Sequence, residues 1–184
     1  MKTESNVKYI LRLTVTLLLI TAIVAALLAV VNGVTAPEIA RINAEKTQAA
    51  IEAVLEGGFD EELTQFDSQN GVVTNVYKGA NGYAVQVIPV GFDGEITMMV
   101  GIGNDGNVTG ISVINQTETA GLGAVCAAKN SAGEAFRNQF VGKTGTLAVT
   151  KDGGEIEAIT SATITSRAVT AGVNAALACI AGLD

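Results

Sequence analysis

An uninterrupted apolar run near the start of the chain constrains its fold more than any other feature. No charged residue occurs from Leu13 to Pro37, and the centre of the run reads LTVTLLLITAIVAALLAVV. The run is about long enough to cross a hydrocarbon layer of about 30 Å. Because lipid offers the backbone no hydrogen-bonding partners, such a segment must be helical. We predict a transmembrane helix over residues 13–36.

The flanks of this run predict its orientation. Lys2, Lys8 and Arg12 precede it and only Glu4 opposes them, so the positive-inside rule places residues 1–12 in the cytoplasm. The rest of the chain would be extracytoplasmic, held by a single pass in the cell (inner) membrane. A cleaved signal peptide and a buried core helix are the alternatives. Against them, the run is longer than an ordinary signal-peptide core and is apolar all round.

Composition excludes several kinds of site. The chain contains no histidine, which rules out histidine-ligated zinc or haem and a Ser-His-Asp triad. Its two cysteines, Cys126 and Cys179, are too few to hold an iron–sulfur cluster, and each is more simply a small buried residue than half of a disulfide. The formal net charge of −7 provides no basic surface for nucleic acid. We expect no nucleic-acid partner and no bound metal.

The segment after the apolar run predicts a stalk helix and then a domain of the α+β class. Pro37 can begin a helix over residues 37–56, which Gly57-Gly58 would end. Segments rich in β-branched residues and bounded by Gly, Asn and Asp then predict strands. These segments are GVVTNVYKG, GYAVQVIPVG, EITMMVGIG, NVTGISVIN, TGTLAVT and GEIEAIT. Residues 57–184 would form one extracytoplasmic domain around a small antiparallel sheet.

Two helices are expected in the second half of this domain. The segment AGEAFRNQF predicts a short one. A longer helix is predicted over residues 164–180, because Val169, Val173, Leu177 and Ile180 repeat at helical spacing.

The segment EAITSATITS, from Glu157 to Ser166, carries the strongest local chemistry. Five of the seven residues from Thr160 to Ser166 bear hydroxyl groups, where a strand ending at Ile159 would be followed by a helix beginning near Ile164. Unpaired N–H groups and the positive end of the helix dipole can bind a phosphate there. Ordinary N-capping by one Ser or Thr is the alternative. The residues alone leave both interpretations open.

This segment resembles the flavinylation motif of the covalent FMN-binding domain family, Asp-x-x-Ser/Thr-Gly-Ala-Thr with a further Ser or Thr soon after. Thr160 takes the Ser/Thr place, Ala162 the Ala place and Thr163 the place of the acceptor. Thr165 matches the later hydroxyl. The resemblance implies that Thr163 is the residue that carries the flavin.

Two positions depart from the motif. Glu157 stands where the family has Asp, which keeps the charge but moves it by one methylene. Ser161 stands where the family commonly has Gly. A serine is accommodated there without strain only if its φ is not positive.

A second segment supports the resemblance. The loop Glu118-Thr119-Ala120-Gly121-Leu122-Gly123 resembles a Glu-Thr-Pro-Gly-Leu-Gly segment of the same family, with Ala in place of Pro. The neighbouring stretches GFDGEITMMVGIGNDGNVTGISVIN and FRNQFVGK are similar too. Order and spacing agree from about Pro37 to Ala181. Within the family, the G subunits of Rnf-type electron-transport complexes are most similar, and the C subunit of sodium-pumping NADH:quinone reductases is related.

The resemblance implies an electron-transfer subunit of a membrane-bound Rnf-type ferredoxin:NAD oxidoreductase complex, active in ion-coupled transport and not an autonomous enzyme. One FMN would be bound covalently through its phosphate, attached by a flavin transferase of the ApbE type with FAD as donor. The partners would be that transferase and the other membrane subunits. The alternatives are an extracytoplasmic flavin-binding sensor or scaffold without redox turnover and the related C subunit of a sodium-pumping NADH:quinone reductase.

The resemblance also implies which residues contact the flavin. Leu122 is expected to pack on its ring, although a plain glycine turn with a solvated Glu118 is the alternative for that loop. The expected cofactor-binding residues are Thr163 as the acceptor, Glu118, Thr119, Gly121, Leu122 and Gly123 in the loop, and Thr160, Ser161, Ala162, Ile164 and Thr165 beside the acceptor.

Overall fold

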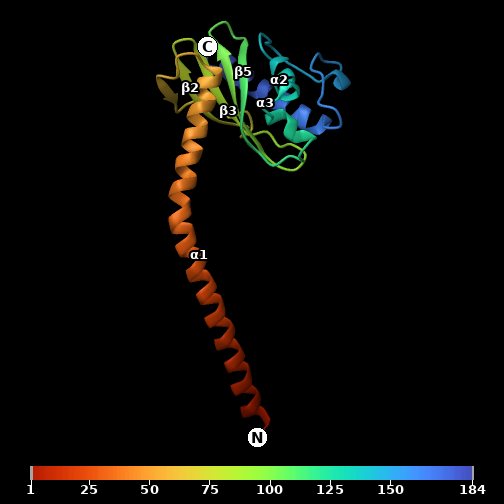
Figure 1. The fold of residues 1–184 in the computed structure, drawn as a ribbon. Coiled ribbons are helices and arrows are strands. Elements are labelled where there is room, and N and C mark those ends of the chain that lie inside the picture. Colours follow the sequence, from red (N-terminus) through yellow and green to blue (C-terminus); the bar gives the residue numbers. More distant parts are fainter. Residues whose placement is uncertain (1, 184) are drawn as a thin grey trace. The chain divides into compact units, whose positions relative to one another are not determined.

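The computed structural model describes residues 2–183, with side chains described from Lys8 onwards. The chain divides into two compact units, residues 1–45 and residues 46–184. The second unit combines an antiparallel sheet with helices (Figure 1). The predicted α+β class is therefore confirmed.

The first helix, α1, is continuous over Lys2–Val54. Within it, Lys8–Val54 is long and apolar enough to cross a membrane, and none of its most apolar stretch is buried. Pro37 lies inside α1, so the prediction that Pro37 begins a separate helix is wrong. The proline removes one backbone hydrogen bond, because it has no N–H to donate to the carbonyl of Gly33. The bounds 13–36 for the membrane span stay a prediction.

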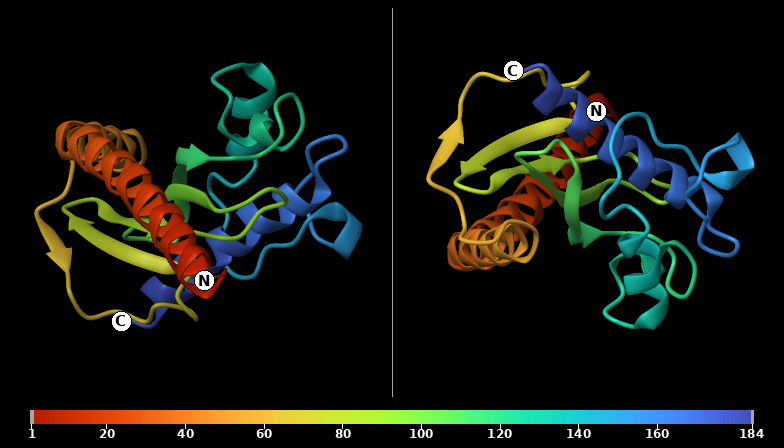
Figure 2. Two further views of the ribbon diagram at one scale, coloured as in Figure 1. Left: turned by 90° about the horizontal axis from the view of Figure 1, so that it is seen from below. Right: turned by 90° about the horizontal axis from the view of Figure 1, so that it is seen from above.

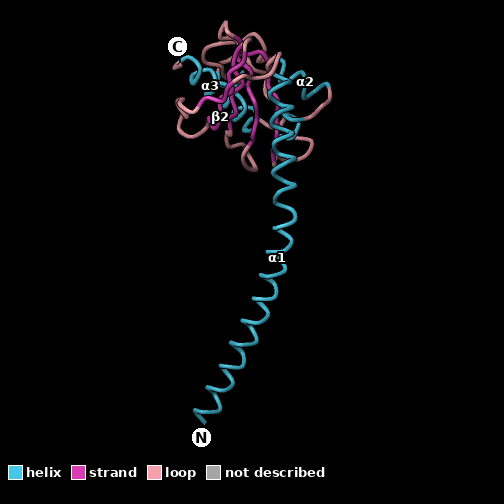
Figure 3. Tube along the Cα trace, turned by 90° about the vertical axis from the view of Figure 1, so that its left-hand side faces the viewer, coloured by secondary structure: helices cyan, strands magenta, loops and turns pink. Residues whose placement is uncertain are grey.

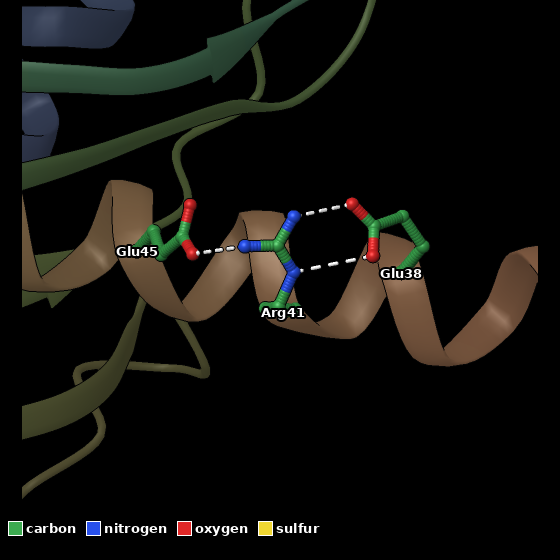
Figure 4. A network of polar contacts seen from close by, with 3 residues as sticks. All are labelled: Glu38, Arg41 and Glu45. Carbon is green, nitrogen blue, oxygen red and sulfur yellow. Dashed lines mark hydrogen bonds and ion pairs between the residues drawn. The ribbon is translucent and has the colours of Figure 1, made fainter.

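A cluster of charges follows the apolar part of α1 (Figure 4). Arg41 donates hydrogen bonds to Glu38 from Nε at 3.1 Å and from Nη2 at 2.5 Å, and to Glu45 from Nη1 at 2.7 Å. The hydrogen bond to Arg41 lowers the pKa of Glu38, and that contact raises the pKa of Arg41. All three side chains are exposed, so solvent screens these pairs and they add little stability.

The sheet has five antiparallel strands in the order β1-β2-β3-β4-β5, so each strand pairs with its neighbours in sequence. Four of the six predicted strands are confirmed as β2 to β5, whereas β1 lies in a segment that the sequence pattern did not mark as a strand. The strands are β1 Glu61–Leu63, β2 Val73–Gly79, β3 Gly82–Val87, β4 Ile96–Gly103 and β5 Val108–Gln116.

The other two predicted strands, residues 144–150 and 154–160, are wrong. Their only pairing is one parallel bridge between Val149 and Ile156. A short 3-10 helix, η2 (Thr150–Asp152), lies between them and ends at Gly153, whose φ is +84°. Two parallel strands need a crossover of about a dozen residues or more, so this short connection permits the bridge but no ladder. Val149 and Ile156 are β-branched because they fill the core, where both are almost fully buried.

Three further helices complete the domain. They are η1 (Gly123–Ala127), a 3-10 helix that the sequence pattern did not predict, α2 (Ser131–Asn138) and α3 (Thr163–Ala181). The predicted helices over 132–140 and 164–180 are thus confirmed as α2 and α3, with bounds shifted by one or two residues. Figure 3 distinguishes these helices from the strands and loops.

The two faces of the sheet are covered by different helices (Figure 2). Successive residues of a strand point to opposite faces. On β2, Val76 belongs to the core cluster that contains α3, whereas Tyr77 belongs to the cluster formed with the end of α1. The second cluster also contains Ile51 and Val54. The sheet therefore fixes α3 on one face and residues 50–55 on the other.

Both cysteines are free and buried, which confirms that each is a small core residue. Burial raises the pKa of the Cys126 thiol to about 11, and it raises the pKa of Cys179 as well. A protonated, buried thiol is unreactive. Cys126 is therefore structural, even though it lies close to the candidate site in sequence.

The packing of α1 on the sheet requires a glycine at position 101. Thr109 Oγ1 donates a hydrogen bond of 2.6 Å to the carbonyl of Val54. A Cβ on Gly101 would overlap that hydroxyl and that carbonyl, and would lie 2.8 Å from the Val54 Cβ. The end of α1 can therefore approach β4 closely only because this residue has no side chain.

We predict that Gly101→Ala destabilises the domain by about 1–3 kcal/mol, because the end of α1 must shift away from the sheet. Gly110 is paired with Gly101 across β4 and β5, and a Cβ there would have its nearest atom at 3.6 Å. Gly110→Ala is therefore the matched control and should leave the stability nearly unchanged. Urea unfolding of the detergent-solubilised chain compares the two variants. Equal stabilities would show that the close approach at Gly101 is unimportant.

Candidate functional site

The carboxylate of Glu118 joins three segments of the domain. Glu118 follows β5 and is only 7% exposed. Its Oε1 accepts hydrogen bonds from the backbone N–H of Phe92 at 2.8 Å and of Asp93 at 3.0 Å. Its Oε2 accepts from the hydroxyl of Thr165 at 2.5 Å. The interpretation of Glu118 as a solvated loop residue is therefore wrong, because this side chain fixes the loop from inside.

Two glycines make room for this carboxylate. A Cβ on Gly91 would overlap Oε1 of Glu118, and a Cβ on Gly123 would overlap Oε2. The same Cβ on Gly123 would lie 2.5 Å from Thr165 Oγ1. A buried charge is tolerated only when donors surround it, so these glycines allow the backbone and the hydroxyl to come within bonding distance.

The N-terminus of α3 has no side-chain cap. Ala162 occupies the N-cap position, and it has no side chain able to accept a hydrogen bond. Thr165 is bonded to Glu118, and Ser166 Oγ donates to the carbonyl of Ala162 at 2.9 Å. The N-capping interpretation of the hydroxyl-rich segment is therefore wrong. The N–H groups of the first turn remain available to an anion.

A pocket of about 310 Å³ lies between this helix terminus and the Glu118 loop. Every predicted site residue except Gly121 and Thr160 lines it, together with one residue that the prediction missed, Phe92. Gly121 and Thr160 line a neighbouring cavity of about 480 Å³ instead. The lining residues are Phe92, Glu118, Thr119, Leu122, Gly123, Ser161, Ala162, Thr163, Ile164 and Thr165.

Three of these lining residues form an exposed apolar rim. Phe92 is 68% exposed, Leu122 41% and Ile164 50%. Large apolar side chains that gather at the mouth of a pocket commonly mark a site for a ligand or a partner. One feature of the sequence could have marked Phe92 as a site residue. It is an aromatic residue in the turn GFDGE, where small polar residues are usual.

The acceptor position has a charged neighbour that the sequence analysis also missed. Lys151, in η2, donates a hydrogen bond of 3.0 Å from Nζ to Thr163 Oγ1. Thr163 is the first residue of α3 and is half-buried. The strands predicted over residues 144–150 and 154–160 put Lys151 in the connection between them, and nothing in that pattern places the connection beside the helix terminus.

The two departures from the family motif have different structural settings. Ser161 has a φ of +62°, so the condition for a strain-free serine is not met, and the preference of the family for Gly there has a conformational cause. Glu157 has an exposed side chain, while its backbone N–H donates to the Gln139 side chain at 2.7 Å. Glu157 lines the neighbouring cavity and not the pocket.

Comparisons with known proteins agree with this geometry. The model of the FMN-binding domain family matches residues 91–178, from the turn before Phe92 into α3. The G subunit of the Na(+)-translocating ferredoxin:NAD(+) oxidoreductase complex of Acetobacterium woodii is 34% identical over 197 residues, covering 94% of this chain and 92% of that protein. The G subunit of the ion-translocating oxidoreductase complex of Methanosarcina acetivorans is 33% identical over 184 residues, covering 94% of this chain and 95% of that protein.

The chain belongs to the family of G subunits of ion-translocating oxidoreductase complexes. The expected resemblance is thereby confirmed over most of the length of the chain. Every residue that lines the 310 Å³ pocket falls within the matched FMN-binding domain. The pocket is therefore the candidate FMN site.

We predict that Ser161→Gly stabilises the domain by about 0.5–1 kcal/mol, because glycine relieves the left-handed backbone strain at a smaller entropic cost. Thr160→Gly is the control. The φ of Thr160 is not positive, so that change only adds freedom to the unfolded chain and should lower the melting temperature. Thermal unfolding followed by circular dichroism measures both. A lower melting temperature for Ser161→Gly would contradict the strain.

We predict that Thr165→Val destabilises the domain by about 1–3 kcal/mol, since the Glu118 carboxylate loses a buried donor. Thr165→Ser keeps the hydroxyl and should remain within about 1 kcal/mol of the original chain. Urea unfolding of the two variants provides the comparison. The proposed role of this hydrogen bond would not survive if the valine variant were as stable as the serine variant.

Proposed function

We propose that the chain is the electron-transfer subunit of an ion-translocating ferredoxin:NAD oxidoreductase complex and that it carries one FMN joined by a phosphoester to Thr163. The observation that carries this proposal is the position of Thr163. Its hydroxyl lies at the uncapped N-terminus of α3, in the wall of the pocket of the FMN-binding domain. The other membrane subunits of the complex are its partners.

The end of the pocket at Thr163 suits a phosphodiester. Such a group carries one negative charge, which the free N–H groups and the helix dipole of α3 stabilise. The ammonium group of Lys151 adds a positive charge beside Thr163 Oγ1. These groups place positive charge at the phosphate end of the pocket, in a chain whose formal net charge is −7.

The other end of the pocket suits a flat apolar ring. Phe92, Leu122 and Ile164 supply apolar surface from three different segments. The volume of the pocket, about 310 Å³, falls at the lower end of the range of small-molecule sites, about 300–1,000 Å³. FMN would supply the electron-transfer chemistry, and the protein would determine the position and surroundings of the ring.

Attachment requires a second protein. In the proposed reaction, a flavin transferase of the ApbE type binds FAD, and Thr163 Oγ1 bonds to the phosphorus on the FMN side. The bond from that phosphorus to the bridging oxygen breaks, AMP leaves, and the hydroxyl proton passes to the solvent. The half-buried setting of Thr163 leaves its hydroxyl accessible to such an enzyme.

The proposed location is the membrane, with α1 as a single-pass anchor. The segment Lys8–Val54 has the required length and composition, whereas α3, which also passes this test, is mostly buried in the domain. The basic residues Lys2, Lys8 and Arg12 favour a cytoplasmic N-terminus. The FMN-binding domain would then be extracytoplasmic.

We predict that Thr163→Ala abolishes covalent flavin, because Thr163 supplies the hydroxyl at the start of α3 that the attachment requires. The chain is produced together with a flavin transferase, and in-gel fluorescence and intact mass then report the attached FMN. In the assembled complex, the variant should also lose ferredoxin-dependent reduction of NAD.

Thr144→Ala is the matched control, because this exposed threonine lies outside both the motif and the pocket. It should keep both the fluorescence and the added mass. Flavin that survives denaturation in the Thr163→Ala chain would show that the acceptor is another residue. Flavin that binds the original chain only without a covalent bond would favour a binding module over the proposed electron carrier.

A further inference from the structure

The ammonium group of Lys151 is hydrogen-bonded to the hydroxyl that the proposed attachment would use. Nζ of Lys151 lies 3.0 Å from Oγ1 of Thr163. Among the side chains described from residue 8 onwards, no carboxylate lies within ion-pair distance of this ammonium group. Among the described lysines, only Lys143 and Lys151 donate a side-chain hydrogen bond, and Lys151 alone donates it to a hydroxyl, that of the proposed acceptor.

The acidic residue nearest in sequence is already paired with another cation. Asp152 accepts a hydrogen bond from Arg167 Nε at 2.7 Å through Oδ2 and one from Nη2 at 2.5 Å through Oδ1. This fork-shaped pairing is the geometry that arginine forms best with a carboxylate. The hydrogen bonds from Arg167 lower the pKa of Asp152. The Asp152 carboxylate is thus already paired with Arg167.

The same pair also bridges η2 and α3, although both side chains are about half exposed, so solvent screens it and it adds little stability. Arg167 lies four residues after Thr163, so both side chains project from the same face of α3. Asp152 directly follows Lys151 in η2, and its hydrogen bonds with Arg167 show that this turn lies beside the start of the helix. The backbone supports this position, because Thr150 N–H donates to the carbonyl of Ile156 at 2.8 Å. The backbone next to Lys151 is therefore held in position by this hydrogen bond.

We propose that Lys151 is a positioning residue for Thr163, orienting its hydroxyl for flavin transfer and then neutralising the phosphodiester. This inference rests on the proposed function. The lysine donates to one lone pair of Oγ1, which restricts rotation of the threonine side chain before the oxygen bonds to phosphorus. A nearby cation also favours negative charge on that oxygen. The ammonium group has two further N–H donors for the phosphate oxygens after transfer.

The test measures the rate of flavin attachment to the purified full-length chain by a flavin transferase with FAD and Mg²⁺. Lys151→Met removes the charge and keeps the apolar stem, while Lys151→Arg keeps the charge. Lys129→Met is the matched control, because Lys129 is an exposed lysine outside the pocket. AMP release and in-gel fluorescence report the rate, and circular dichroism verifies that each variant is folded.

Lys151→Met should lower kcat for attachment about tenfold, the loss expected for one charge-assisted hydrogen bond that solvent partly screens. The KM for the chain should stay unchanged, because the lysine acts on the reacting oxygen and not on docking of the transferase. Lys151→Arg should restore most of the rate, and Lys129→Met should match the original chain. An unchanged kcat in Lys151→Met, or a change confined to KM, would overturn the orienting role.

A second measurement tests the role after transfer. The phosphorus-31 resonance of the attached phosphodiester should shift in Lys151→Met and remain in place in Lys129→Met. An unchanged resonance in Lys151→Met would overturn the neutralising role. An original chain that is never modified at Thr163 would overturn both the proposed function and this inference. Normal modification with no effect of Lys151→Met would overturn the inference alone.

Discussion

The buried carboxylate of Glu118 is the constraint on which the candidate site depends. A carboxylate withdrawn from water is costly unless hydrogen-bond donors replace its hydration. Here the donors come from the turn at Phe92 and Asp93 and from Thr165 in the first turn of α3. Each of these segments must stay in place to satisfy the charge. The geometry of the pocket is therefore set by one polar centre, although apolar side chains provide much of its lining.

This polar centre is coupled to the core through α3. The buried face of the helix, which includes Val169 and Val173, packs against the sheet. That packing fixes the helix axis, and the Glu118 bond to Thr165 fixes its first turn. Thr163, two residues earlier, therefore has a defined position relative to the Glu118 loop. A reactive hydroxyl on a free loop would not have this positional constraint.

The sequence predicted the elements whose signals are local. The β-branched segments that form β2 to β5 and the periodicity of α3 reflect burial in the domain core, whereas the apolar run is recognised by its length and lack of charge. The pattern failed for residues 144–160, because β-branched residues such as Val149 and Ile156 favour strands but do not reveal whether a neighbouring strand exists to pair with. Most of the site residues came from the motifs, whereas Phe92 and Lys151 reach the site through tertiary packing that no local spacing encodes.

The openness of the pocket gives a physical reason for a covalent link. Phe92, Leu122 and Ile164 are each between 41% and 68% exposed, so a ring lying on them would keep part of its surface in water. A ligand held by such partial burial dissociates when its free concentration is low. Deeper burial would retain the ring but would also separate it from electron donors and acceptors on partner subunits. On the proposal that Thr163 carries FMN, the phosphoester provides retention, and the open rim leaves the ring accessible for electron exchange.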